Sequence, residues 1–367
     1  MYIDSITLRD YRNYASALLT PCRGVSVLMG DNAQGKTNLL EAVYLCCTGR
    51  SHRTSHDREL IRLGQEAAYV KVSGVRRDGA HDVEIGMNRS GHRRVKVNGS
   101  PVSRSGELLG HISGVLFAPE DLRMVTDGPQ VRRRFLDMEI SQLRADYYYA
   151  LQRYSRALKQ RNALLRDCML NGNAPDSIEL WEDELAASGS VIMLARRAFT
   201  DKLSLSAAQI HSSITGGGEA LSVSYVPDVE MGEDGAEMEN RIRQALSSAR
   251  QGDLKRGVTS RGPHRDDIAI FIGGMDARFY GSQGQVRTSA LSLKLSEIDL
   301  IEKETGEAPV LMLDDVMSEL DPSRRRQLIR RLEGVQTLVT CTDKNDLAGA
   351  EIGKLYSVRG AVLTEEA

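Results

Sequence analysis

The stretch Gly30-Asp31-Asn32-Ala33-Gln34-Gly35-Lys36-Thr37 decides the fold of this chain. It matches the pattern GxxxxGK[ST], in which a glycine-rich loop leads from a buried strand into a helix. Both neighbours are expected: the apolar run Val25-Ser26-Val27-Leu28-Met29 precedes the loop, and apolar residues at helical spacing follow it over residues 39–47. The sequence therefore predicts an α/β fold built around a phosphate-binding loop.

The loop residues form the expected nucleotide site. Glycines allow backbone N–H groups to curl around phosphates, and the helix N-terminus adds a partial positive charge. We expect Lys36 to reach the β- and γ-phosphates of ATP and the Thr37 hydroxyl to bind Mg²⁺. The expected ATP-binding set is Gly30, Asp31, Asn32, Ala33, Gln34, Gly35, Lys36, Thr37 and, from a later motif, Ser282.

A second motif supplies the metal side of the site. The apolar strand Val310-Leu311-Met312-Leu313 ends in two carboxylates, Asp314 and Asp315. Beside a phosphate-binding loop, this arrangement predicts that Asp314 holds the Mg²⁺ through water and that Asp315 positions or deprotonates the attacking water. A pair of acids that caps a turn is the alternative, and it is the weaker one once the loop is present.

Two further motifs point to a second copy of the chain. Gly281-Ser282-Gln283-Gly284-Gln285 opens a helix and is a candidate anion site, with Ser282 as the contact. Because the sequence holds one phosphate-binding loop, the ligand expected here is the γ-phosphate presented by another copy. A plain glycine-containing loop with a serine cap is the alternative. Ser318-Glu319-Leu320-Asp321-Pro322 starts a helix after the metal strand and could cross the same interface.

Composition bounds the class of protein. The 367 residues are 41% hydrophobic and 27% charged, which suits a globular protein with a sizeable core. A net charge of −2 means that any nucleic-acid site must be a local basic face. The five cysteines lack zinc spacing, the first residues lack a signal core, and no apolar run is long enough to span a membrane. We therefore expect free thiols and a cytoplasmic location.

The pattern along the chain suggests one α/β layer interrupted by a helical insertion. Helical patterns predict long helices over 130–169 and 178–214, joined by a turn at 171–177 and paired as a hairpin. The first of these helices repeats leucines at sevenfold spacing from Leu151 to Leu165. The expected parts are an N-terminal part of the ATPase lobe at 1–125, a mainly helical insertion lobe at 126–257 that includes an exposed acidic linker over 228–239, and a C-terminal part of the ATPase lobe at 258–367.

These four motifs in this order resemble the ABC-type ATPase heads of the SMC and Rad50 group, with a phosphate loop, a signature, a metal strand and a D-loop. A large insertion separates Lys36 from Ser282, unlike in transporter ATPases. Finer matches resemble the RecF family of bacterial recombination mediators over essentially the whole chain. The matching stretches are Leu8-Arg9-Asp10-Tyr11-Arg12-Asn13-Tyr14, Gly49-Arg50-Ser51-His52-Arg53-Thr54, Phe117-Ala118-Pro119-Glu120-Asp121-Leu122, Arg132-Arg133-Arg134-Phe135-Leu136-Asp137 and Arg261-Gly262-Pro263-His264-Arg265-Asp266-Asp267.

The resemblance implies both a fold and a function. The fold is a P-loop NTPase of the ABC/SMC-head type with a helical insertion lobe. RecF-like proteins bind ATP, form an ATP-dependent homodimer, clamp duplex or gapped DNA and hydrolyse ATP slowly, here expected as a weak DNA-stimulated ATPase. They act with RecR and RecO to help RecA load at gaps, and they contribute to the SOS response. Lys36, Asp315 and Ser282 would be the catalytic residues, and Thr37 and Asp314 the metal ligands.

The chain departs from the wider ABC pattern in three places. The metal strand ends in Asp-Asp where transporters usually carry Asp-Glu, and the shorter Asp315 fits slow hydrolysis. The stretch Cys341-Thr342-Asp343 carries no switch histidine, so Thr342 is the weak substitute. The loop near Glu120 lies where a glutamine-bearing sensor loop is expected, without an assignable sensor residue.

Candidate DNA contacts are basic residues near the junction of the lobes. They are Arg132, Arg133 and Arg134 at a helix start, and Arg50, His52 and Arg53 on a loop. Ion pairs within the chain, or contacts with nucleotide, are an equal alternative, and 324–326 is expected to be a solvated helix face. Aromatic content is only 5%, so contact with the backbone of duplex DNA is more natural than base stacking.

Three other functions stay open. An ATPase head of a nuclease-coupled or SMC-like DNA complex would need a long coiled coil, which the sequence lacks. A transport ATPase subunit is disfavoured by the large insertion and by the missing histidine. A scaffold that binds ATP without hydrolysing it fits the same residues.

Overall fold

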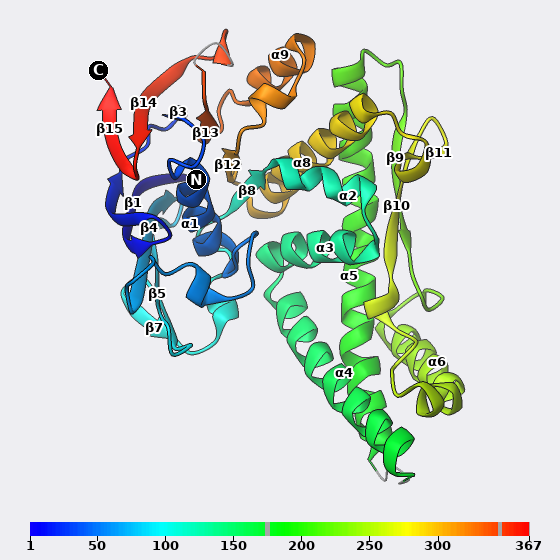
Figure 1. The fold of residues 1–367 in the computed structure, drawn as a ribbon. Helices are drawn as coiled ribbons and strands as arrows, with labels where there is room; N and C mark the ends of the chain where they lie inside the picture. Colours follow the sequence, from blue (N-terminus) through cyan, green and yellow to red (C-terminus); the bar gives the residue numbers. More distant parts are fainter. Residues whose placement is uncertain (173–176, 344–346, 367) are drawn as a thin grey trace. The chain divides into compact units, whose positions relative to one another are not determined.

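The computed structural model describes residues 1–172, 177–343 and 347–366 (Figure 1). The chain forms two compact units, each assembled from separated stretches of sequence. Unit 1 comprises Met1–Leu122, Ser206–Glu219 and Gln283–Ala367, and unit 2 comprises Arg123–Leu205 and Ala220–Ser282. The expected α/β fold with a helical insertion is confirmed.

Unit 1 contains an antiparallel six-stranded sheet with strand order β2-β1-β4-β5-β6-β7. Its strands alternate buried and exposed residues, as expected for a sheet with one face on the core. Their bounds are β1 (Tyr2–Tyr11), β2 (Tyr14–Leu19), β4 (Ala67–Arg76), β5 (Gly79–Asn88), β6 (Arg93–Val97) and β7 (Ser100–Val102).

The second sheet of unit 1 carries the site. Its order is β15-β14-β3-β13-β12-β8, and every pairing is parallel except that of β14 with β15. The central strands β12 and β13 are buried along their whole length, which is typical of a sheet covered on both faces. The bounds are β3 (Val25–Met29), β8 (Gly114–Phe117), β12 (Val310–Leu313), β13 (Thr337–Cys341), β14 (Ile352–Arg359) and β15 (Val362–Glu366).

Helix α1 (Lys36–Thr48) packs between the two sheets of unit 1, in contact with β8 and β13 on one side and β4 and β5 on the other. It is therefore buried on nearly all sides, whereas the sequence pattern predicts a single apolar face. Unit 1 also contains α8 (Gln283–Thr305), α9 (Pro322–Arg331), the last turns of α5 (Ile178–Thr215), and the short turns η1 (Asp57–Glu59), η2 (Ser105–Leu108), η3 (Pro119–Leu122) and η5 (Met317–Glu319).

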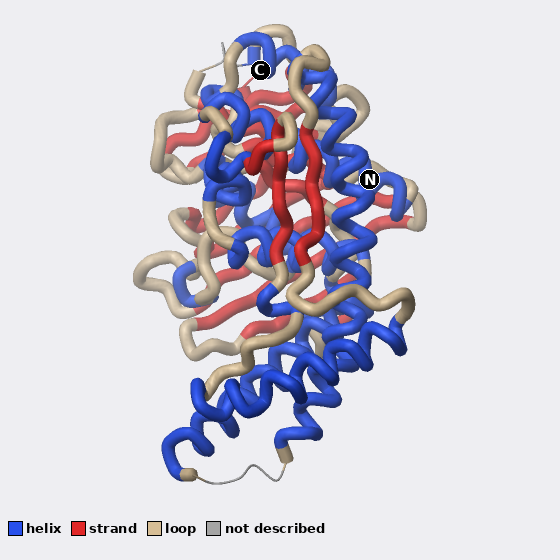
Figure 2. The backbone as a smooth tube through the Cα atoms, turned by 90° about the vertical axis from the view of Figure 1, so that its right-hand side faces the viewer, coloured by secondary structure: helices blue, strands red, loops and turns tan. Residues whose placement is uncertain are grey.

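Unit 2 is mainly helical and includes a three-stranded sheet with order β11-β10-β9. Figure 2 shows the long antiparallel pair formed by β9 and β10. The elements are α2 (Arg123–Thr126), α3 (Pro129–Leu143), α4 (Ala145–Asn171), most of α5, β9 (Leu221–Val226), α6 (Gly235–Arg256), η4 (Pro263–Arg265), β10 (Asp267–Ile272), β11 (Met275–Asp276) and α7 (Ala277–Tyr280).

The helical region differs from the sequence prediction in two respects. The run expected over 130–169 is two helices, because the chain is extended at Arg144 between α3 and α4. Helix α6 starts inside the segment expected to be a linker: the Asp234 side chain caps it by accepting from the N–H of Glu237. The turn expected at 171–177 lies largely outside the described residues.

The two units also divide the chain differently from the expected lobes. Residues 258–282 fall in unit 2, because β10 pairs along its whole length with β9. Residues 206–219 fall in unit 1, so α5 passes from one unit into the other. Among the described residues, no helix is both long and apolar enough to cross a membrane.

Candidate functional site

The loop between β3 and α1 has the backbone that its glycines predict. A Cβ at Gly30 would lie 2.3 Å from the carbonyl oxygen of Val358, which no side chain can tolerate. Gly35 has a φ of 117° and a Cβ there would lie 2.8 Å from Nδ2 of Asn13. Only glycine therefore fits at these two positions. Without side chains there, the loop backbone packs closely against Val358 and Asn13.

Side chains from both ends of the chain hold the loop in shape. The buried Lys36 ammonium donates to the carbonyls of Gly30 (2.6 Å) and Asp31 (3.2 Å), so the lysine lies across the loop. The carbonyl of Gln34 accepts from Nδ2 of Asn13 (3.2 Å) and from the N–H of Ala361 (3.0 Å). The loop is thus fixed from β1–β2 and from β14–β15.

The opposite wall of the site is the end of β12. Oδ1 of Asp314 accepts hydrogen bonds from the hydroxyls of Thr37 and Thr340, each over 2.9 Å. Burial raises the pKa of Asp314, and the two hydroxyl bonds oppose that shift. The negative charges of Asp315 and Glu120 raise this pKa further. The first turn of α1, the end of β12 and strand β13 therefore meet at one carboxylate.

Asp315 adopts an unusual backbone conformation directly after the strand. Its φ is 51°, a region that few residues other than glycine enter, although Asp and Asn do so more readily than most. Its N–H donates to Oγ1 of Thr340 over 2.8 Å, and its side chain is half-buried. The neighbouring strand therefore fixes the turn that presents this second carboxylate, a constraint often found at functional sites.

The residues present fit a triphosphate with a divalent cation. The loop carries no side chain at Gly30 or Gly35 and leads directly into the N-terminus of α1, whose partial positive charge favours a phosphate. Thr37 and Asp314 offer hydroxyl and carboxylate oxygens, the hard ligands that Mg²⁺ prefers alongside phosphates and water. Within the described residues, no group of three or more His, Cys, Asp or Glu forms a separate metal site.

Two sequence stretches that resembled the RecF family brace this loop. The guanidinium of Arg12 donates to both oxygens of the fully buried Glu41 on α1, at 2.6 and 2.7 Å. Ser51 donates to the same carboxylate over 2.6 Å. Burial alone would raise the pKa of Glu41, but these bonds hold it below its usual value. The stretches at 8–14 and 49–54 thus anchor α1.

A groove of about 660 Å³ adjoins the loop in unit 1. Asn13, whose side chain donates to the carbonyl of Gln34, forms part of its wall, and arginines dominate the rest. Arg53 in this wall donates to Oδ1 of Asn38 over 2.9 Å. The lining residues are Arg12, Asn13, Asn38, Arg53, Arg58, Glu59, Ile61, Leu63 and Arg89.

The signature and D-loop motifs have the expected local structure. Ser282 is exposed, ends unit 2 and directly precedes α8. Asp321 caps α9 by accepting from the N–H groups of Ser323 (2.9 Å) and Arg324 (3.0 Å). Arg324 is half-buried and pairs with Asp321, so the helix face at 324–326 is not simply solvated as the sequence predicts.

The three consecutive arginines expected to contact DNA have different surroundings. Arg132 is buried and makes a bidentate ion pair with Asp267, at 2.7 and 2.8 Å. Arg133 donates to the carbonyl of Asp266 over 2.6 Å, whereas Arg134 is exposed. The ion-pair interpretation therefore holds for Arg132. Its partner, Asp267, lies on β10 and is far from Arg132 in the sequence.

One functional residue escaped the sequence analysis. Thr342, the expected substitute for a switch histidine, is exposed beyond the end of β13. Thr340, two residues earlier, contacts Asp314 and the backbone of Asp315. Its signal in the sequence is a hydroxyl side chain next to apolar residues in a strand, but the contact depends on the pairing of β13 with β12.

The chain matches the family described as RecF/RecN/SMC N terminal domain over residues 2–362. It is 41% identical over 361 residues to the DNA replication and repair protein RecF of Acetivibrio thermocellus, with 98% of each chain covered. It is 43% identical over 373 residues to the RecF of Halothermothrix orenii, with 99% of each covered. The chain belongs to the RecF family.

Solved structures agree with this assignment. A RecF structure, described as the recombination mediator protein RecF-ATP in the RecFOR pathway, matches with a TM-score of 0.93 at 37% identity, covering 100% of this chain and 98% of that one. An Smc head domain from Pyrococcus furiosus matches with a TM-score of 0.57 at 16% identity, covering 100% of this chain and 96% of that one. The second likeness shows the fold alone, which RecF and the Smc heads share.

Proposed function

We propose that this chain binds ATP with Mg²⁺ in the loop at 30–37, associates through the nucleotide into a homodimer, and in that form clamps duplex or gapped DNA during recombinational repair. The observation that carries the proposal is the convergence on Asp314: the hydroxyls of Thr37 and Thr340 both donate to it, and Asp315 follows it directly in the chain. Membership of the RecF family supports the DNA-repair role.

The chain's own residues divide the work of ATP hydrolysis. Mg²⁺-ATP, when bound, supplies the phosphoanhydride bond and the cation that neutralises its charge. Lys36 leaves the loop carbonyls to neutralise the β- and γ-phosphates, while Thr37 and Asp314 orient the cation. The Asp315 carboxylate accepts the proton of the attacking water. An aspartate in this role and the absence of a histidine at Thr342 fit slow turnover.

The nucleoside has a place beside the loop. The groove of about 660 Å³ is large enough for a base and a ribose, and arginines and asparagines in its wall offer hydrogen-bond donors. Arg12 has a second role there, because its guanidinium already anchors Glu41. Ser282 of one copy would complete the site around the phosphates held by the other copy.

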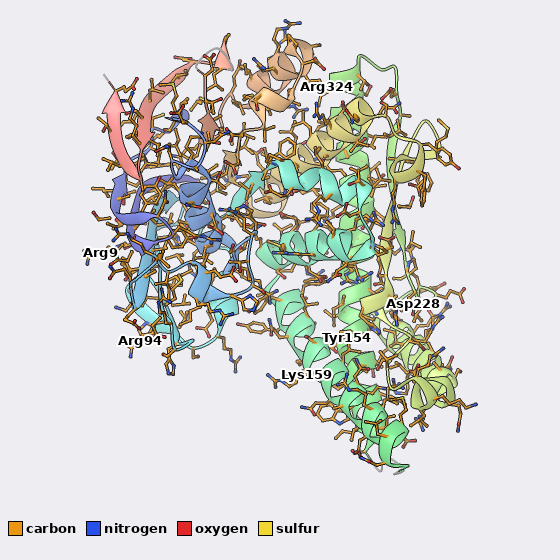
Figure 3. The ribbon with its side chains drawn as sticks, in the orientation of Figure 1. Arg9, Arg94, Tyr154, Lys159, Asp228 and Arg324 are labelled. Atoms are coloured by element: carbon orange, nitrogen blue, oxygen red, sulfur yellow. The ribbon has the colours of Figure 1, made fainter. Side chains whose placement is uncertain are left out.

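DNA contact is assigned to the exposed face of α4 rather than to Arg132. Arg156, Lys159 and Arg166 are exposed and lie on one face, since they are three and seven residues apart (Figure 3 labels Lys159). None of the three pairs with a carboxylate in the part of the chain that the structure describes. Cations of this kind bind phosphates without reading sequence.

The protein partners follow from the family. A related structure is described as a recombination mediator in the RecFOR pathway, which supports RecR and RecO as partners and RecA as the protein that is loaded at gaps. These partners and the contribution to the SOS response belong to the same proposal, because they share its DNA-bound, ATP-dependent state.

Sedimentation velocity tests the proposal directly. The chain should sediment as a monomer without nucleotide and as a dimer with Mg²⁺-ATP, and fluorescently labelled duplex DNA should co-sediment only with the dimer. ATP consumption in the same samples should be slow and should rise with DNA. A monomer with ATP, or equal DNA binding with and without ATP, contradicts the clamp. Dimerisation and DNA binding without any ATP consumption would favour the non-hydrolysing scaffold.

A further inference from the structure

The first turn of α8, which continues the signature motif, is held by a side chain from outside the helix. Nε2 of Gln285 donates to Oε1 of Glu219 over 2.9 Å. The acceptor is a carboxylate, so this bond is charge-assisted and stronger than a bond between neutral groups. Glu219 follows the three glycines at 216–218, after the end of α5.

Glu219 also lies beside a buried histidine. Its Oε2 is 3.6 Å from Nε2 of His211, too far for a hydrogen bond but close enough for an electrostatic interaction. Nδ1 of His211 lies 3.2 Å from Oγ of Ser292 on α8. Burial lowers the pKa of His211, so its ring is neutral near pH 7. The end of α5 and the segment after it thus contact α8 at Gln285, at Ser292 and, through the hydroxyl of Ser206, at Asp299. Of these three, Gln285 lies nearest the signature.

The chain path gives this bond its significance. The chain leaves unit 1 after Glu219 and returns to it at Gln283. The Glu219–Gln285 bond therefore links the residue at the exit with the turn at the return, across 66 residues of sequence. Gly216 and Gly217 both have positive φ values and accept conformations closed to other residues, so the backbone before Glu219 is poorly constrained by itself.

Helix α9, which follows the metal strand in the chain, contacts the same helical turn from another side. A Cβ at Gly284 would lie 3.4 Å from Nη2 of Arg324, so the guanidinium rests against the helix start. Arg324 projects from α9 (Figure 3) and pairs with Asp321 over 2.7 Å. Helix α9, downstream of Asp314 and Asp315, thus reaches the signature helix within the same unit.

We infer that Glu219 is a positioning residue for the signature: through Gln285 it fixes the first turn of α8 and thereby the direction in which Ser282 is presented to a second copy of the chain. The inference rests on the proposed function, since it requires an ATP-dependent dimer. Small misplacements of a contact residue have large effects on a site that assembles from two parts.

Four variants separate the hydrogen bond from simple loss of stability. Glu219→Ala removes the acceptor, and Glu219→Gln keeps an oxygen at the same place. Gln285→Glu puts two carboxylates together, and combining Glu219→Gln with Gln285→Glu restores a donor and an acceptor in the reverse direction. Glu302→Ala is the control, an exposed glutamate near the far end of the same helix.

The readouts are the dimer dissociation constant with Mg²⁺-ATP, kcat and KM for ATP, and the affinity of a fluorescent ATP analogue under dilute, monomeric conditions. Glu219→Ala and Gln285→Glu should weaken the dimer and lower kcat by about tenfold or more, as expected when a charge-assisted bond is removed. Monomer affinity for the analogue should stay within twofold, because the loop at 30–37 is untouched. The double variant and Glu302→Ala should stay near the wild type. Glu219→Gln, whose bond joins two neutral groups, should lose less than Glu219→Ala.

Two results overturn the inference. One is a Glu219→Ala protein that dimerises and hydrolyses ATP like the wild type. The other is a double variant that dimerises as weakly as Gln285→Glu. That result would mean that side-chain volume or fold stability, and not the hydrogen bond, causes the weaker dimer. A wild-type chain that stays monomeric with ATP contradicts the proposed function itself and the inference with it, and this outcome is distinct because it does not involve the variants.

Discussion

The hydroxyl of Thr340 donates to Oδ1 of Asp314 over 2.9 Å, and this same oxygen accepts the hydroxyl of Thr37 over 2.9 Å. The end of β12, the neighbouring strand β13 and the first turn of α1 thereby meet at a single carboxylate oxygen. Thr340 also accepts the N–H of Asp315, so one hydroxyl orients the proposed metal ligand and the backbone of the proposed base.

Thr340→Val should therefore impair metal use. The substitution removes the hydroxyl and keeps the β-branched shape in a buried strand position. We expect the Mg²⁺ concentration at half-maximal ATP turnover to rise by roughly 10–100-fold, the usual effect of removing a group that orients a metal ligand. Thr340→Ser keeps the hydroxyl and should behave like the wild type. Identical Mg²⁺ dependence in all three proteins would show that Thr340 has no such role.

Asp315→Asn should uncouple ATP binding from hydrolysis. The amide cannot accept a proton from water, so cleavage should slow by roughly 10²–10⁴-fold, the usual contribution of a general base. Asparagine tolerates the positive φ at this position, so the turn should persist. Single-turnover hydrolysis measures the chemical step, and the ATP-bound dimer should accumulate. Unchanged turnover would show that another residue is the general base, and Glu120 would be tested next.

Local pattern was enough for the parts of the site that are contiguous in sequence. The strand, loop and helix around Lys36, and the strand that ends at Asp314, each carry their own signal. Thr340 was missed because its role depends on β13 lying beside β12. The burial of Arg132 was equally invisible, since Asp267 is 135 residues away in sequence.

The missed helix has a different cause. In α6 the apolar residues Met238, Ile242 and Leu246 recur every four residues and are buried, as helical periodicity requires. Acidic residues at the start of this segment favoured an exposed linker, although Asp234 is a helix cap. The sequence prediction gave more weight to the acidic composition of this segment than to its helical periodicity. The periodicity was the better predictor of the structure.

The basic face of α4 should determine the salt dependence of DNA binding. Replacing Arg156, Lys159 and Arg166 with alanine should lower the slope of log affinity against log salt by about one unit for each DNA phosphate that these side chains neutralise. Arg132→Ala should leave the slope unchanged and lower the thermal unfolding midpoint, because it breaks a buried pair with Asp267. If Arg132→Ala lowered the slope and the triple variant on α4 did not, DNA would contact Arg132 instead.

The stability of the chain should fall on mild acidification, in part through His264. Nε2 of this ring faces the carbonyl of Thr259 at 3.1 Å and must donate, so Nδ1 accepts from the hydroxyl of Tyr154 at 2.6 Å. Burial lowers the pKa of His264 in the folded state. Below the pKa of about 6.5 that His264 has in the unfolded chain, this histidine binds a proton in the unfolded chain but not in the folded one. The free energy of unfolding therefore decreases.

Urea denaturation followed by circular dichroism at pH 7.5 and pH 5.5 measures this effect. His264→Gln keeps an acceptor for Tyr154 but cannot titrate, so its midpoint should fall less than that of the wild type over this range. His111 and His211, whose pKa values are also lowered, mainly by burial, remain in both proteins and contribute equally. An identical fall in both proteins would remove His264 from the pH dependence.

The most direct test of the account asks whether one ATP site is built from two copies of the chain. Lys36→Met damages the phosphate loop, and Ser282→Arg damages the signature, so each protein alone should stay monomeric with Mg²⁺-ATP. A mixed dimer has one site with both lesions and one in which an intact loop meets an intact signature. Sedimentation velocity of the mixture with Mg²⁺-ATP should therefore show a dimer that neither protein forms alone. A mixture that stays monomeric, under conditions in which the wild type dimerises, would contradict the clamp and confine Ser282 to its own chain.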